Sequence, residues 1–502
     1  MASRPSRAAA CPPAHNPGHL LRTCHRSPTR SFTRTRFLLC LLSLSLLLAT
    51  ACARPGEGSD GRTVLRVTTW ASQEELAIME RSVELFEAVY PEVDVRHEPV
   101  TVNYKEKIMI SLAGGAPPDV MLLDSDDMPA FVDRGLLLNL APYARRVGLD
   151  LDLFYPHVLA IGQRGEALYA WPKDFTPMVI YYNRDLLEAA GVAPEGVNWT
   201  RDEFLAAARA VRRDSDGDGE PEIYGAYIGR YFYAWQPWIW AGGGAVFSPD
   251  GTRAVGYTDS EAVNRTITFL TDLRLRYALA PRPEVFRGTS GMVQNLFYIG
   301  RVAMIESGHW WLPKLGSYVQ DGRVSIGVAN IPHAAGQEPV TVMYESGWAV
   351  PVGSRHRQWA IRLAAFLADE ECQRLRGELG LAIPAMPHIA EEIVRSDPWG
   401  IGDAFLQIIP TARPSRGTQI DNYRVAARQL EEIFDRVYAR GEAVPAATAA
   451  VAPKVEAALA PRPGTRPGAD SGPGSGPGSD SGSESSPEQV GDAGGNRGGL
   501  RP

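Results

Sequence analysis

Residues 117–124 read PPDVMLLD, and this stretch decides the fold class. The run after Asp119 is apolar up to Asp124, which is typical of a strand buried on both faces of a parallel sheet. Two more strands are predicted before it, VLRVTTW at 64–70 and VDVRHEPV at 93–100, each followed by a helix. Strands that alternate with helices indicate β-α units wound around a parallel sheet, so we expect an α/β protein.

The carboxyl ends of these strands are the expected place for a ligand, as in other wound α/β sheets. Trp70 stands at the end of the first strand, and Asp124, Ser125 and Asp126 follow the third. An aspartate directly before a helix also serves as an N-terminal cap. Asp124 and Asp126 therefore have two possible roles, ligand contact and helix capping.

The N-terminal segment has the pattern of an export signal. Residues 1–36 contain seven arginines and no acidic residue, and residues 37–51 form an apolar run of 15. Such a run is short for a bilayer span, which takes about 20 residues, but it suits a signal peptide over 1–51. The junction LATAC resembles a bacterial lipobox, which would make Cys52 the lipidated first residue of a membrane-anchored linker over 52–63. Cleavage without lipid, and a start codon further downstream, are the alternatives.

The rest of the composition narrows the class of protein. Cys372 is the one cysteine beyond residue 52, so we expect no internal disulfide and a buried thiol. The tail over 461–502 is rich in Gly, Ser and Pro and contains no aromatic residue, which predicts disorder. A net charge of −7 without Lys/Arg clusters argues against binding of nucleic acid.

Two adjacent stretches, MVIYYNRDLLEAAGV at 178–192 and WTRDEFLAAARAV at 199–211, carry a specific resemblance. The chain resembles the family 1 extracellular solute-binding proteins, the maltose-binding-protein-like lipoprotein receptors of sugar-importing ABC transporters. Further matching elements follow the family order across nearly the whole body. They include GGAPPDVMLLD, YFYAWQPWIWAGGG, GRVAMIESGHWW, IGVANIP and SGWAVPVGS.

The resemblance implies the two-lobe periplasmic-binding-protein fold (type II-like), with discontinuous lobes joined by hinge crossovers and a ligand cleft between them. We expect the first lobe over 64–173 and 300–348, and the second lobe over 174–299 and, as a helical segment, over 349–460. The hinge crossings are expected near 172–175, 298–301 and 347–350.

A carbohydrate ligand is also implied, and its chemistry suggests which residues bind it. Aromatic rings cover the apolar faces of a sugar, and carboxylates and amides pair with its hydroxyl groups. Each aromatic candidate has core packing as its alternative, because tryptophan is highly buried on average. The predicted ligand-binding residues are Trp70, Asp124, Ser125, Asp126, Asp174, Phe175, Tyr231, Tyr233, Trp235, Trp310, Trp348 and Tyr423.

The loop DSDGDGEPEIYG at 214–225 has half of a calcium-binding pattern. Asp214, Asp216 and Asp218 would occupy positions one, three and five of a helix-loop-helix calcium site, and Glu222 falls at position nine. The glutamate usual at position twelve is replaced by Gly225. The loop either binds a structural calcium ion or forms a solvated acidic turn. Calcium is the one cofactor that this sequence suggests.

The resemblance implies a monomeric receptor on the outer side of the membrane that binds a carbohydrate. The receptor would deliver the carbohydrate to two ABC permease subunits, which work with a separate ATPase. An exported enzyme is the rival, but the sequence has no H-E-x-x-H, G-x-S-x-G or Walker A motif. Other solutes, such as a glycerol phosphate, a polyamine or iron, and a sensory role stay open. A phosphate would favour arginines such as Arg230 and Arg424.

Overall fold

The computed structural model describes residues 61–71, 73–282, 293–420 and 422–460. The predicted signal peptide, Cys52, most of the linker and the predicted disordered tail lie outside these residues and stay predictions. Among the described helices, none is both long and apolar enough to cross a membrane.

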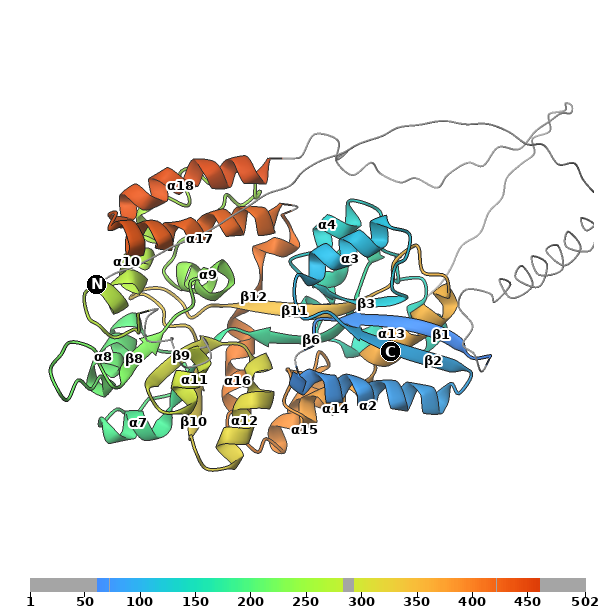
Figure 1. Cartoon of the computed structure of the whole chain (residues 1–502), viewed down its shortest axis with the longest axis horizontal. Coiled ribbons are helices and arrows are strands. Elements are labelled where there is room, and N and C mark those ends of the chain that lie inside the picture. Colours follow the sequence, from blue (N-terminus) through green and yellow to red (C-terminus); the bar gives the residue numbers. More distant parts are fainter. Residues whose placement is uncertain (1–60, 72, 283–292, 421, 461–502) are drawn as a thin grey trace, which may run out of the picture. The chain divides into compact units, whose positions relative to one another are not determined.

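The first sheet has a parallel centre, as the sequence predicts. Strand β1 (Thr63–Thr69) pairs in parallel with β2 (Val93–Pro99) on one side and with β3 (Val120–Asp124) on the other. The sheet continues through β11 (Thr341–Ala349), which pairs antiparallel with β3 and β6 (Trp171–Pro177) and in parallel with the short β12 (Ala412–Pro414). These strands from distant parts of the sequence lie side by side in Figure 1.

Strand β3 is apolar because both of its faces are buried. Val120 and Leu122 belong to the core shared with α2 (Gln73–Val89) and α13 (Arg357–Ala368). Met121 and Leu123 belong to a separate cluster with α3 (Tyr104–Ala113) and α4 (Met128–Val132). Successive side chains of a strand point to opposite faces, so an uninterrupted apolar run is needed where helices cover both.

The second sheet has the strand order β10-β7-β9-β8, with β10 at Ile326–Ala329, β7 at Val179–Asn183, β9 at Val302–Ser307 and β8 at Tyr224–Tyr227. Tyr181 and Tyr182 pack within β7, and the Asn183 side chain accepts the N–H of Leu186 at 3.1 Å, which caps the turn into the next helix. A capping box of Thr200 and Glu203 opens α8 (Arg201–Val211).

Helices complete both lobes. The second core contains residues of α8, α9 (Phe232–Ala241), α10 (Glu261–Leu275), α17 (Tyr423–Arg440) and α18 (Val444–Leu459). The remaining elements are α5 (Ala144–Val147), α6 (Pro156–Leu159), β4 (Gln163–Arg164), β5 (Ala167–Leu168), α7 (Arg184–Ala189), α11 (Val293–Tyr298), α12 (Leu312–Gln320), α14 (Glu370–Glu378), α15 (Pro387–Arg395) and α16 (Gly402–Ile408).

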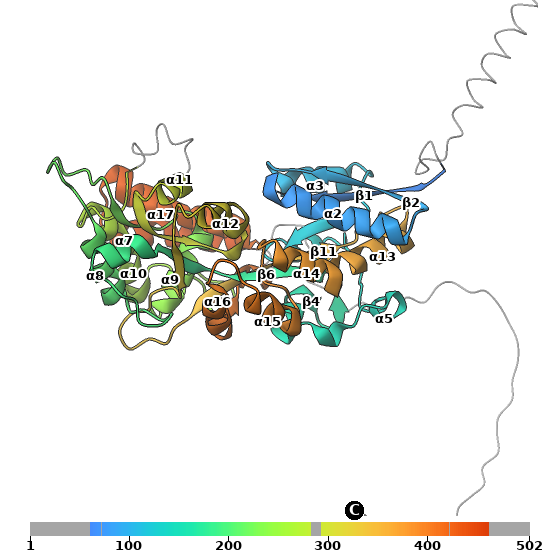
Figure 2. The ribbon, with the colours of Figure 1, turned by 90° about the horizontal axis from the view of Figure 1, so that it is seen from below.

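The predicted lobe boundaries need correction after residue 299. Segment 300–348 does not return to the first sheet as a whole, because β9 and β10 pair with β7 of the second sheet and only β11 belongs to the first. Likewise, 349–460 is not one second-lobe segment. In Figures 1 and 2, α13 lies with α2 beside β1 and β2, whereas α17 lies with α9 and α10. Helical periodicity identifies a helix but carries no information on which sheet it covers.

Replacement of a β3 core residue tests this two-faced burial. We expect Leu122→Ala to lower the free energy of unfolding by about 2–5 kcal/mol, because it removes buried methyl groups and leaves a cavity. Val102→Ala, at an exposed turn position, is the control and should stay within about 0.5 kcal/mol of the wild type. Urea unfolding followed by circular dichroism measures both; equal effects would contradict the assignment.

Candidate functional site

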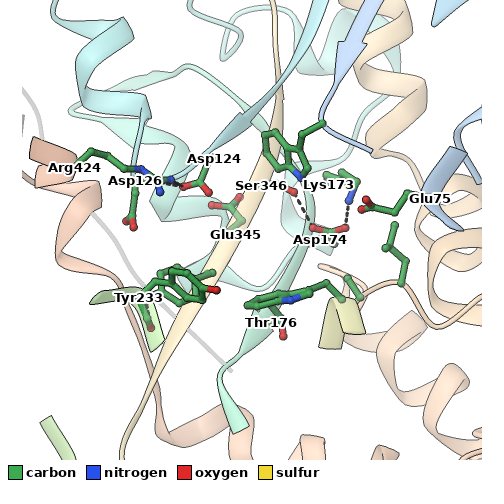
Figure 3. Close-up of a pocket in the computed structure, with 15 residues that line it drawn as sticks. Glu75, Asp124, Asp126, Lys173, Asp174, Thr176, Tyr233, Glu345, Ser346 and Arg424 are labelled. Atoms are coloured by element: carbon green, nitrogen blue, oxygen red, sulfur yellow. Dashed lines mark hydrogen bonds and ion pairs between the residues drawn. The ribbon is translucent and has the colours of Figure 1, made fainter. Parts of the chain in front are cut away.

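A cavity of about 470 Å³ is lined by residues of both lobes. The first sheet contributes residues of β3, β6 and β11, and the second lobe contributes α9, α17 and the segment that follows β9. The lining consists of Trp70, Glu75, Asp124, Asp126, Lys173, Asp174, Thr176, Tyr233, Trp310, Tyr344, Glu345, Ser346, Leu381, Ala382 and Arg424. Figure 3 shows the charged side chains and Ser346 along one side of the cavity and Tyr233 and Thr176 on the other.

The register of β11 places its polar residues between two acidic strand positions. Ser346 lies opposite Asp124 of β3 and opposite Asp174 of β6. Its hydroxyl donates a hydrogen bond of 2.9 Å to Asp174 Oδ1. A β-bulge follows between Ser346 and Gly347, where a Cβ on the glycine would lie only 3.0 Å from the Trp171 carbonyl oxygen. Glycine is therefore needed for the close approach of these two strands.

Both basic groups of the cavity are held by ion pairs. Arg424 Nη2 lies 2.7 Å from Asp124 Oδ1, and its Nε donates to Asp127 Oδ1 at 3.1 Å. Lys173 pairs with its neighbour Asp174. Asp124 Oδ1 also accepts the backbone N–H of Asp126, so this carboxylate both shapes the turn after β3 and faces the cavity. Helix capping, the second role considered for Asp124 and Asp126, is not observed, because the N-cap residue of α4 is Asp127.

Asp126 and Glu345 are the buried acids of the cavity wall. Burial, followed by the charge of Asp124, raises the pKa of Asp126 to about 7 against the opposing effect of Arg424. Burial, followed by the charges of Asp174 and Asp124, raises the pKa of Glu345 well above its usual range. Both shifts have the same origin, since a low-dielectric site and neighbouring carboxylates each disfavour the charged form.

Aromatic rings complete the cavity. The side chains of Trp310 and Tyr233 are 41% and 46% exposed, unusually high for large rings in a concave site. The ring of Trp310 lies against Gly308, where any Cβ would overlap it. The Thr176 hydroxyl oxygen accepts the His309 N–H at 2.7 Å and so ties the Trp310 segment to β6. Trp70 packs edge-on against Tyr104, with ring centroids 5.2 Å apart.

Half of the predicted ligand-binding residues line the cavity, and the other half do not. Trp70, Asp124, Asp126, Asp174, Tyr233 and Trp310 line it. Ser125, Phe175, Trp235, Trp348 and Tyr423 are buried in the two lobes, and Tyr231 is exposed beside Tyr233 without lining the cavity.

The buried residues have structural partners that explain their positions. The indole N–H groups of Trp235 and Trp348 donate to the carbonyl oxygens of Arg230 and Leu367, at 3.2 and 3.0 Å. Tyr423 bonds through its hydroxyl to Gln236, and the Ser415 hydroxyl donates to it at 3.1 Å. Phe175 packs against Tyr155. The polar groups of Trp235, Trp348 and Tyr423 are thus bonded within the protein.

Sequence reasoning missed nine lining residues: Glu75, Lys173, Thr176, Tyr344, Glu345, Ser346, Leu381, Ala382 and Arg424. Alternation along β6 from Asp174 would have pointed to Thr176. Tyr344, Glu345 and Ser346 directly precede the predicted third hinge crossing, and that position was the available signal. Arg424 had been considered only as a phosphate ligand. Lys173 lies on β6 beside the predicted Asp174, whereas Glu75, Leu381 and Ala382 come from a helix and a loop whose orientation no local pattern sets.

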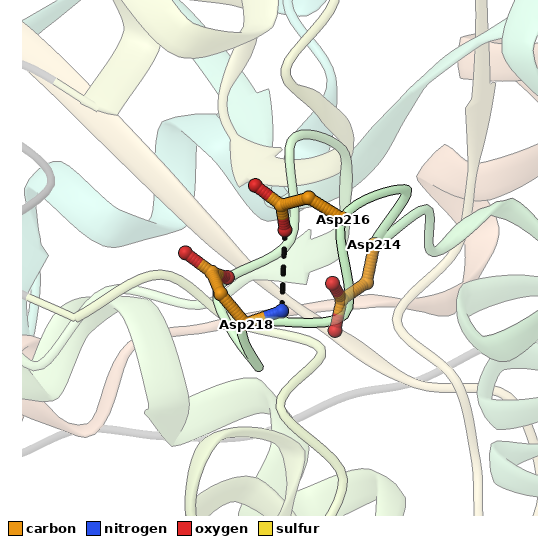
Figure 4. Close-up of side chains that lie close together, drawn as sticks. All are labelled: Asp214, Asp216 and Asp218. Atoms are coloured by element: carbon orange, nitrogen blue, oxygen red, sulfur yellow. Dashed lines mark hydrogen bonds between the residues drawn. The ribbon is translucent and has the colours of Figure 1, made fainter.

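The acidic loop lies elsewhere, in the second lobe. Carboxylate oxygens of Asp214, Asp216 and Asp218 lie within 4.8 Å of one another (Figure 4). Asp214 also pairs with Arg212 at 2.9 Å, and both Glu222 oxygens accept the N–H of Ser215. None of these residues lines the cavity, so the loop is separate from the main site.

The pattern that defines the bacterial extracellular solute-binding proteins matches residues 70–374, more than half of the chain. The chain therefore belongs to this family, whose members are binding proteins. The two-lobe α/β fold and the inter-lobe position of the cavity agree with this assignment.

Characterised relatives share a modest identity with this chain. The galactooligosaccharide-binding protein of Bacillus subtilis is 25% identical over 370 residues, which are 71% of this chain and 81% of the relative. The arabinooligosaccharide-binding protein of the same organism is 22% identical over 344 residues, 67% and 76% of the two chains. An ABC substrate-binding protein from Listeria monocytogenes, solved in complex with cycloalternan, superposes with a TM-score of 0.69 at 19% identity and covers 79% of this chain and 99% of its own.

The calcium site in the 214–222 loop is kept as a proposal, because three carboxylates already converge there. Calcium at about 1 mM, the scale of extracellular calcium modules, should raise the melting temperature and protect the loop from proteolysis. Asp216→Asn should abolish both effects, and Asp435→Asn, an exposed control outside the loop, should abolish neither. A melting temperature that is the same with calcium and with a chelator would contradict the proposal.

Proposed function

We propose that the chain is the solute receptor of an ABC importer and that it binds a carbohydrate in the inter-lobe cavity. The observation that carries this proposal is the combination of exposed rings with hydroxyl-binding groups in one cavity. Trp310 and Tyr233 offer apolar faces for sugar rings, and the carboxylates and Ser346 offer partners for hydroxyl groups. The oligosaccharide-binding names of two relatives support the same class of ligand.

The bound sugar would pass to a membrane permease of two subunits with a separate ATPase, which the family membership supports. The same membership supports a role in binding. We propose that the protein acts as a monomer.

Phosphorylated solutes fit the cavity poorly. Arg424 is the one arginine of the lining, and its guanidinium is already paired with Asp124 and Asp127. Arg230, the other arginine considered for a phosphate, pairs with Asp435 outside the cavity. A phosphate group would also meet the carboxylates of the wall, and like charges at close range are unfavourable. We therefore favour a sugar over a glycerol phosphate.

Replacement of Trp310 tests the sugar platform. Trp310→Ala should weaken binding of the cognate oligosaccharide by about 1–3 kcal/mol, the scale of one aromatic contact. The free protein should lose little stability, because the ring is partly exposed before a ligand arrives. Trp238→Ala, in the second core, is the matched control and should cost about 3–5 kcal/mol of stability.

Titration calorimetry against an oligosaccharide panel and urea unfolding measure the two quantities. Intrinsic fluorescence should change saturably with ligand, and the change should shrink in Trp310→Ala. Full affinity in Trp310→Ala, or a loss of stability equal to that of Trp238→Ala, would show that Trp310 is a packing residue.

The family is extracellular, so the protein is exported, and we propose in addition that Cys52 carries a lipid anchor. Expression in a lipoprotein-competent bacterium should give a membrane-associated product. Cys52→Ser should be released or mis-processed because the acyl acceptor is gone, whereas Cys40→Ser, within the predicted leader, should stay membrane-bound. Equal solubility and equal processing of wild type and Cys52→Ser would mean that cleavage occurs without lipid.

A further inference from the structure

The cavity has an excess of carboxylates over bases. Among the residues that the structure describes, five acidic side chains line it against two basic ones, and each base is already paired with one of the acids. Two of the remaining acids, Glu345 and Asp126, form no ion pair with either base among the described residues. Glu345 lies between the Arg424–Asp124 pair and the Lys173–Asp174 pair, and Asp126 lies beside Arg424 (Figure 3).

These two acids are also incompletely bonded. Glu345 and Asp126 are 5% and 6% exposed. Glu345 Oε2 and Asp126 Oδ1 have no hydrogen-bond partner among the described residues. A buried carboxylate without a full set of partners is costly, so native proteins retain one mainly where a ligand, ion or water completes it. Both side chains face the cavity that we assign to the ligand.

A neutral sugar hydroxyl donates a hydrogen bond to a carboxylate but brings no charge to balance it. A phosphate brings the wrong charge. An ammonium group brings the opposite charge and up to three N–H donors, and hydrogen bonds between ionised partners are roughly twice as strong as neutral ones. The unbalanced wall thus favours a cationic ligand over a neutral or anionic one.

We infer that the cavity prefers a carbohydrate bearing a protonated amino group, held against Glu345 and Asp126, to the neutral counterpart of the same sugar. This inference rests on the proposed function, since it takes the ligand to be a carbohydrate. It adds the charge of that ligand and the two residues that select it.

The titration of the wall supports the inference. Burial and neighbouring carboxylates raise the pKa of both acids, and a bound cation would lower it again because it favours the charged form, so binding of a cation is coupled to loss of protons from the wall. Proton release should therefore accompany binding of the amino sugar and not of the neutral one. The charged and titratable groups that surround the two acids are Asp124, Asp127, Lys105, Lys173, Asp174, Glu306, Tyr233, Tyr344, Tyr423 and Arg424.

Matched sugars provide the test. The full-length protein is titrated with the β-1,4-linked disaccharide of glucosamine, with its N-acetylated form and with the corresponding glucose disaccharide, and the same series is repeated for galactose. These probes share ring and linkage and differ in charge. In whichever series the protein binds, the amino sugar should bind about tenfold tighter or more than its neutral counterparts, as expected for one charge-assisted contact. Its binding enthalpy should vary with the ionisation enthalpy of the buffer, which reports proton release.

Two variants assign the preference to its residues. Glu345→Gln should reduce the ratio of the two affinities towards one, and Asp126→Asn provides the same test at the second acid. Asp435→Asn, at an exposed position outside the cavity and the acidic loop, should leave the ratio unchanged. If Glu345→Gln does not fold, Asp126→Asn and the buffer dependence of the wild type still decide the question.

The failures of the two proposals are distinguishable. Neutral sugars that bind as tightly as their amino forms, without proton release, would overturn the inference and leave the proposed function intact. Binding of a polyamine such as spermidine, with no sugar of either charge bound, would overturn both.

Discussion

The pairing of β11 with two strands at once is the constraint on which the site depends. Its antiparallel register sets Ser346 opposite Asp124 on one side and opposite Asp174 on the other. Glu345, the residue before Ser346 on β11, therefore lies between Asp124 of β3 and Asp174 of β6. Strand register moves in steps of one residue, and each step exchanges the two faces, so this arrangement is held firmly once the apolar faces of β3 and β11 are buried.

Charge compensation follows from that arrangement. Carboxylates gathered at one sheet edge repel each other unless bases pair with them. Lys173 is adjacent in sequence to its partner Asp174, whereas Arg424 belongs to α17 of the other lobe and reaches Asp124 and Asp127 across the cavity. The Arg424 pairs thus join the lobes at the site. A hydrogen bond of 2.9 Å from the Tyr344 hydroxyl to the Tyr233 carbonyl oxygen is a second link between β11 and α9.

The same edge explains which tryptophans face a ligand. Trp310 is held against Gly308 on a short segment tied to β6 through Thr176, so its ring stays exposed to the cavity. Trp235 and Trp348 have their indole N–H groups bonded to backbone carbonyls inside the lobes. Exposure of a large ring costs stability in the free protein, and binding of an apolar sugar face can offset that cost.

The local pattern of the sequence predicted the parallel centre of the first sheet and placed Trp70, Asp124 and Asp126 at the ends of its strands. The family resemblance added Trp310. A doubly buried strand must be apolar at every position, and that requirement is visible in PPDVMLLD without any knowledge of its neighbours. Only the tertiary structure decided the lobe to which β9, β10 and α13 belong, since periodicity reports that an element has a buried face but not what buries it. The tertiary structure also decided that Trp348 packs in the core of the first lobe, whereas Glu345 lines the cavity. Both lie on β11, and the choice depends on strand pairing and on a bulge between residues more than 160 positions apart in the chain.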